Sequence, residues 1–108
     1  MGIAWEDVWS QALTAATDAV KTKGPTAQAY IRKILTARER RLGLLIVAWA
    51  AGDLDEATLQ GELDEERDLL QAEFLAIQVL TKKAAQDAVN AVFDVIEAAL
   101  LQGVNVIV

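Results

Sequence analysis

The amino-acid sequence predicts an all-α protein that folds as a single helical domain over residues 1–108. Hydrophobic residues make up 54% of the chain, above the roughly 45–50% of an average protein, and alanine accounts for much of the excess. Only one proline and six glycines are present, so the chain has little turn material to separate strands. Apolar residues recur three and four positions apart over most of its length, which is the spacing of helices that bury one face.

The first helix is expected over residues about 3–22, where the apolar residues form a single stripe. Gly24 and Pro25 then end it, because glycine can adopt a left-handed C-terminal conformation and proline suits the first turn of the next helix. So short a link folds the first helix back along the second. Counting residues across this antiparallel pair places Trp5 beside Gly43.

The second helix is expected over residues about 26–51, and a short link with Gly52 and the N-cap Asp55 makes the next helix its antiparallel neighbour. The two facing flanks carry opposite charge. Residues 21–41 hold seven basic side chains and one acidic one, whereas residues 53–73 hold nine acidic and one basic. We therefore expect structural ion pairs across the hairpin. The expected cross-hairpin charges are Arg38, Arg41, Glu65 and Glu66.

The third helix is expected to run unbroken over residues about 56–102, because this stretch has no proline and one internal glycine. It would be roughly 70 Å long, whereas a compact domain of this size has a radius of gyration of about 13 Å. The expected architecture is a three-helix up-down-up bundle with a long, projecting C-terminal helix. The alternative is a four-helix bundle with a break near Thr81-Lys83, although no glycine or proline marks such a break.

The projecting part of this helix would leave a face of small apolar residues bare, and the apolar tail at residues 103–108 would also need a partner. A second copy of the chain would cover both surfaces, and a two-fold dimer is the default form of such a homo-oligomer. The expected oligomerisation residues are Ala84, Ala85, Ala88, Val89, Val92, Val95, Ile96, Ala99, Val106 and Val108.

Composition and motifs argue against an enzyme. The chain has no cysteine and no histidine, which removes thiolate catalysis, the commonest general base and the commonest transition-metal ligands. Glu62, Glu66 and Glu73 share a helix face but lack the histidines of a di-iron site. Residues 53–55 resemble the start of a calcium loop, but the later ligand positions do not match. We therefore expect no catalytic residue, no cofactor and no metal.

The net charge of −6 disfavours a nucleic acid or an anionic membrane as the partner. The longest uncharged apolar run, residues 42–52, is far shorter than the roughly 20 residues that span a bilayer. The N-terminal residues are acidic and lack the basic-then-apolar order of a signal peptide. A cytoplasmic location is therefore expected.

The expected function is non-enzymatic self-assembly through the C-terminal helix. One alternative is a small acidic adaptor or inhibitor, of the kind that phages and other mobile elements encode, that binds another protein through the same apolar face. A third interpretation is a carrier that holds an apolar ligand between the small-residue helix and the tryptophans.

Overall fold

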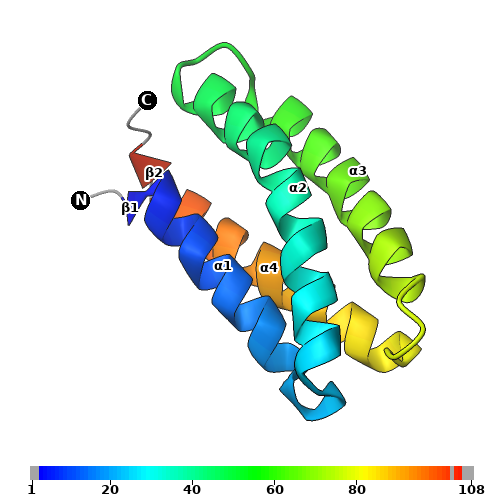
Figure 1. Cartoon of the computed structure of the whole chain (residues 1–108). Helices are drawn as coiled ribbons and strands as arrows, with labels where there is room; N and C mark the ends of the chain where they lie inside the picture. The colour runs from blue at the N-terminus through cyan, green and yellow to red at the C-terminus, as the bar shows by residue number, and fades with distance from the viewer. Residues whose placement is uncertain (1–2, 103, 106–108) are drawn as a thin grey trace.

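The computed structural model describes residues 3–102 and 104–105, and within this part four α-helices form an antiparallel bundle (Figure 1). The helices are α1 (Trp5–Ala19), α2 (Pro25–Ala50), α3 (Glu56–Leu75) and α4 (Lys82–Gln102). The short elements are the 3-10 turn η1 (Lys21–Lys23) and the strands β1 (Ile3–Ala4) and β2 (Val104–Asn105). The helical class predicted from the sequence is confirmed. Over the described ranges, none of the helices combines the length and apolar character needed to cross a membrane.

The links between the first three helices follow the expected turn signals. Gly52, after α2, has a φ of 82°, in the left-handed region that glycine enters at little cost. Asp55 caps α3, because its Oδ1 accepts a hydrogen bond of 2.7 Å from the backbone amide of Thr58. The link after α1 folds that helix back along α2, and Trp5 lies against Gly43. A Cβ atom at Gly43 would come within 3.0 Å of the indole nitrogen.

The expectation of one continuous helix from 56 to 102 is wrong, because the chain turns over residues 76–81 and α4 folds back. Thr81 caps the new helix: its Oγ1 accepts a hydrogen bond of 3.1 Å from the amide of Ala84. Ile77 is buried at the corner, and Leu80 packs against the core. The turn uses neither glycine nor proline. The described residues therefore adopt the four-helix alternative, with the break just before α4.

The turn is favourable because it buries the face of α4 that was expected to be bare. Val89, Val92, Phe93 and Ile96 are each at most 1% exposed. Full burial of one such side chain contributes about 1.5–3 kcal/mol, whereas each helical hydrogen bond lost at the turn costs about 1 kcal/mol. The free energy gained by burying these side chains therefore exceeds the cost of interrupting the helix. The molecule measures 41 × 24 × 20 Å and has no projecting helix among the described residues.

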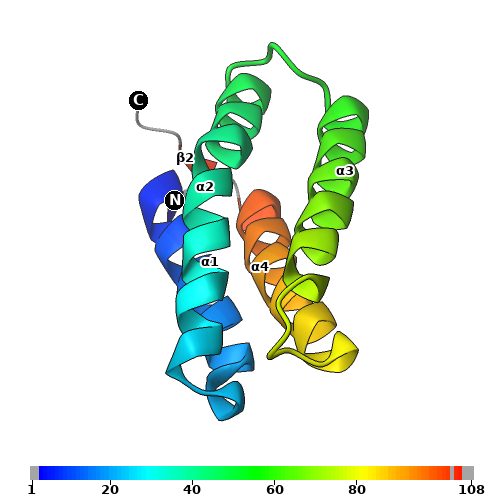
Figure 2. The same cartoon turned by 45° about the vertical axis from the view of Figure 1, so that its right-hand side comes forward.

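The helix that covers this face is α1, which runs antiparallel to α4 and makes the most extensive helix–helix contact with it (Figure 2). Both helices contribute small, fully buried residues: Ala12 and Ala16 from α1, and Ala85 and Ala88 from α4. Small side chains allow two helix backbones to approach closely. The contacts α1–α2, α2–α3 and α3–α4 complete a ring of four antiparallel neighbours.

Of the apolar tail expected over residues 103–108, the structure describes residues 104–105. Val104–Asn105 pairs in parallel with Ile3–Ala4, which holds the end of α4 beside the start of α1. The expected oligomerisation residues Val106 and Val108 lie outside the described residues.

Packing of α4 against its own chain can be tested by enlarging one buried alanine. Ala88→Leu should lower the free energy of unfolding by about 1–3 kcal/mol, because the added atoms do not fit a filled core. Ala98→Leu is the matched control, since Ala98 lies on the exposed face of the same helix and should change stability by less than about 0.5 kcal/mol. Urea unfolding followed by circular dichroism measures both. Equal effects would contradict the observed orientation of α4.

The Asp55 cap predicts a specific pH dependence. The hydrogen bond from the Thr58 amide holds the pKa of Asp55 below its ordinary value of 3.8. Its stabilising contribution is therefore present above pH 3.8 and is lost as the pH falls through the lowered folded pKa. Asp55→Asn should lower the urea midpoint at neutral pH, and the difference from wild type should shrink in acid. Asp53→Asn removes the same charge from the same link without removing the cap, and it is the matched control.

Candidate functional site

The expected oligomerisation residues on α4 lie inside the bundle. Helices α1 and α3 of the same chain pack against α4, so this face is already covered without a second copy. The buried members are Ala84, Ala85, Ala88, Val89, Val92, Ile96 and Ala99, each at most 8% exposed. Val95 is partly buried and packs against the same core.

The cross-hairpin charges form a partly buried ion-pair cluster between α2 and α3. Glu66 is only 6% exposed. One of its carboxylate oxygens lies 3.3 Å from Nε of Arg41, and the other lies 3.5 Å from a terminal guanidinium nitrogen of Arg38. Arg38 also pairs with Glu73, and Arg41 pairs with Glu62 at 3.1 Å. The cluster sets the register of the α2–α3 hairpin.

Removing the central carboxylate should destabilise the fold, because two arginines would lose their shared partner. Glu66→Gln should lower the free energy of unfolding by about 1–3 kcal/mol. Glu65, the neighbouring carboxylate that was also expected in the cluster, is exposed and forms no ion pair with any residue that the structure describes. Glu65→Gln should therefore change stability by less than about 0.5 kcal/mol. If urea unfolding showed the same loss of stability for both variants, the loss would come from the change in net charge and not from the ion pairs.

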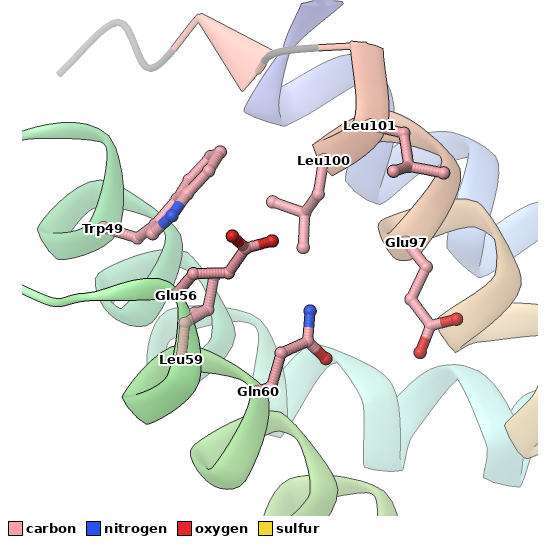
Figure 3. A pocket seen from close by; sticks show the side chains of 7 residues that line it. All are labelled: Trp49, Glu56, Leu59, Gln60, Glu97, Leu100 and Leu101. Carbon is pink, nitrogen blue, oxygen red and sulfur yellow. The ribbon is translucent and has the colours of Figure 1, made fainter.

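A groove of about 280 Å³ opens between α3 and α4, at the end of the bundle where α2 and α4 finish (Figure 3). Three helices contribute its lining. The lining residues are Trp49 from α2, Glu56, Leu59 and Gln60 from α3, and Glu97, Leu100 and Leu101 from α4. The groove therefore joins residues that are up to 52 positions apart in the chain.

Four of the seven side chains that line the groove are apolar. Leu59 is buried at its base, and Trp49 and Leu100 are partly buried on opposite walls (Figure 3). Leu101 is 90% exposed, which is the highest value among the large apolar side chains of the described residues. A single exposed leucine is ordinary on a protein surface, but this one adjoins three other large apolar side chains. Leu101 and the exposed parts of Trp49 and Leu100 form an apolar patch above the buried Leu59.

The rim of the groove is acidic. Glu56 stands on the α3 wall and Glu97 on the α4 wall, with the amide of Gln60 between them (Figure 3). Both glutamates are exposed, and neither forms an ion pair within the described part of the chain. Residues 42–66 and 90–102 contain no lysine or arginine that could neutralise them. An apolar surface between two free carboxylates suits a partner that carries apolar and cationic groups.

Sequence reasoning missed this groove because the turn at residues 76–81 creates it. One local signal was present. Leu100 and Leu101 are adjacent, and adjacent residues of a helix do not face the same neighbour, so one of them had to point away from the core. Comparisons of the chain with protein-family models, with curated proteins and with solved structures found no match. The geometry of the groove is therefore the basis for the function proposed below.

Proposed function

We propose that the protein is a non-enzymatic interaction module whose acidic groove binds a protein segment with apolar and basic side chains. The observation that supports this most is the 90% exposure of Leu101 beside Trp49 and Leu100. Covering such a patch is favourable by about 25 cal/mol for each Å² of apolar surface removed from water. The glutamates on both walls would orient the segment and disfavour acidic competitors.

The size of the groove favours a protein segment over a small ligand. Its volume of about 280 Å³ lies just below the range of about 300–1,000 Å³ that is typical of small-molecule sites. A groove between two helices suits the apolar face of an amphipathic helix, with one or two side chains inserted as anchors. Basic residues beside those anchors would then lie near Glu56 and Glu97.

The other two interpretations have less support. Self-assembly through residues 84–99 was expected because that face would be bare, and it is buried within the chain. A carrier was expected to hold its ligand beside the tryptophans. However, Trp9 is buried in the core, Trp5 packs on Gly43, and the two rings lie 6.0 Å apart. Binding of a protein partner remains, with its site moved from the expected face to the groove.

The proposal is tested with a labelled amphipathic peptide of leucine and lysine, whose binding is followed by fluorescence anisotropy. Leu101→Ser should weaken binding by about tenfold or more, because burial of one leucine contributes about 1.5–3 kcal/mol. Leu69→Ser is the matched control: Leu69 is an exposed leucine on α3 outside the groove, and its loss should leave binding unchanged. Equal affinity of both variants and wild type would refute the groove as the site.

The acidic rim is tested through the salt dependence of the same binding. The double variant Glu56→Gln with Glu97→Gln should bind more weakly and should lose most of the decrease in affinity that added salt causes. The double variant Asp64→Asn with Glu65→Gln removes the same charge from exposed positions of α3 outside the groove. That control should keep the wild-type salt dependence.

A further inference from the structure

Charge is segregated along the long axis of the bundle. We define the acidic end as residues 42–61 and 94–102, which hold five carboxylate side chains and no lysine or arginine. The basic end comprises residues 16–33 and 74–90, which hold six lysines and arginines and two aspartates. These two sets lie at opposite ends of a molecule 41 Å long (Figure 1). The chain is thus acidic overall but strongly bipolar.

The basic end also carries uncovered apolar groups. Tyr30 of α2 is 50% exposed and Val79 of the α3–α4 turn is 48% exposed, and both line a hollow of about 510 Å³. Ile77 forms part of its base and is buried, and Glu73, whose charge is paired with Arg38, also lines it. On its other side, Tyr30 borders a second hollow that Lys33 also lines. An exposed aromatic ring flanked by a lysine is the combination of apolar and cationic groups that the acidic groove suits.

We infer that the occupant of the acidic groove is the basic end of a second copy of this chain, docked head to tail. This inference rests on the proposed function of the groove and names its partner. Tyr30 and Val79 of one copy contact Leu100 and Leu101 of the next, and Lys33 lies near the glutamates of the rim. One contact covers Leu101 at the acidic end together with Tyr30 and Val79 at the basic end. An unrelated basic partner in the groove would leave Tyr30 and Val79 in water.

The contact joins two different surfaces, so it is heterologous. A docked pair keeps one free groove and one free basic end, and copies therefore add in a row or close into a ring. The bundle is 24 × 20 Å in cross-section, so an end-to-end contact buries on the order of 1,000 Å² in total, at the low end for specific interfaces. Association is therefore weak, and salt weakens it further by screening the opposed charges.

The test is sedimentation velocity of the full chain from micromolar to millimolar concentration, at low and at high salt. Wild type should show a mass that rises with concentration at low salt and falls on adding salt. Leu101→Ser damages only the groove and Tyr30→Ser damages only the basic end, so each variant alone should remain monomeric. An equimolar mixture of the two should form a heterodimer and nothing larger, because only one intact groove meets one intact basic end. Leu69→Ser, a change outside both surfaces, should associate like wild type.

Two results would overturn the inference. One is a wild-type chain that stays monomeric at millimolar concentration and low salt. The other is a Tyr30→Ser variant that associates by itself, which would mean that the contact does not use the basic end. Neither result touches the proposed function, because binding of the leucine–lysine peptide to the groove is measured separately. If the wild-type chain failed to bind the leucine–lysine peptide, the proposed function would be wrong, and this inference would be wrong with it.

Discussion

The packing of α4 against α1 is the contact on which the rest of the structure depends. Both helices carry fully buried alanines, such as Ala16 and Ala88, and this allows the two backbones to approach closely. The contact requires the chain to reverse after α3. In a continuous helix, Leu101 would lie roughly 70 Å from Glu56, whereas in the bundle both line one groove. The same reversal brings the end of α4 to the acidic end of the molecule and its lysine-rich start to the basic end.

Features set by local chemistry could be predicted from the sequence. The left-handed Gly52, the Asp55 cap and the placement of Trp5 against Gly43 all follow from short-range signals or from counting along antiparallel helices. The turn at residues 76–81 could not be predicted in this way. Its residues are compatible with a helix, and the choice between turn and helix depends on apolar surface that only the folded α1 can cover.

The groove was unpredictable for the same reason, because its two walls are neighbours only after the chain has turned. The charge cluster was easier to predict from the sequence, since Arg38 and Arg41 face Glu66 in any antiparallel α2–α3 hairpin. The partners Glu62 and Glu73 depend on side-chain reach, which sequence counting does not resolve. The acidic stretch thus holds two kinds of carboxylate. The carboxylates paired with arginine set the register of the α2–α3 hairpin. The carboxylates without an ion pair among the described residues make the surface around them negative.

The uneven distribution of charge affects how two copies of the chain would approach each other. With a net charge of −6, two copies repel each other on average. However, the molecule is 41 Å long, about four times the screening length of about 10 Å at 0.1 M salt. A molecule near one end therefore interacts with the charges of that end, while the charges of the other end are largely screened. For two copies, the approach with opposite charges facing is the basic end of one toward the acidic groove of the other. In the proposed contact, charge would select this orientation, and the few exposed apolar side chains would then hold it.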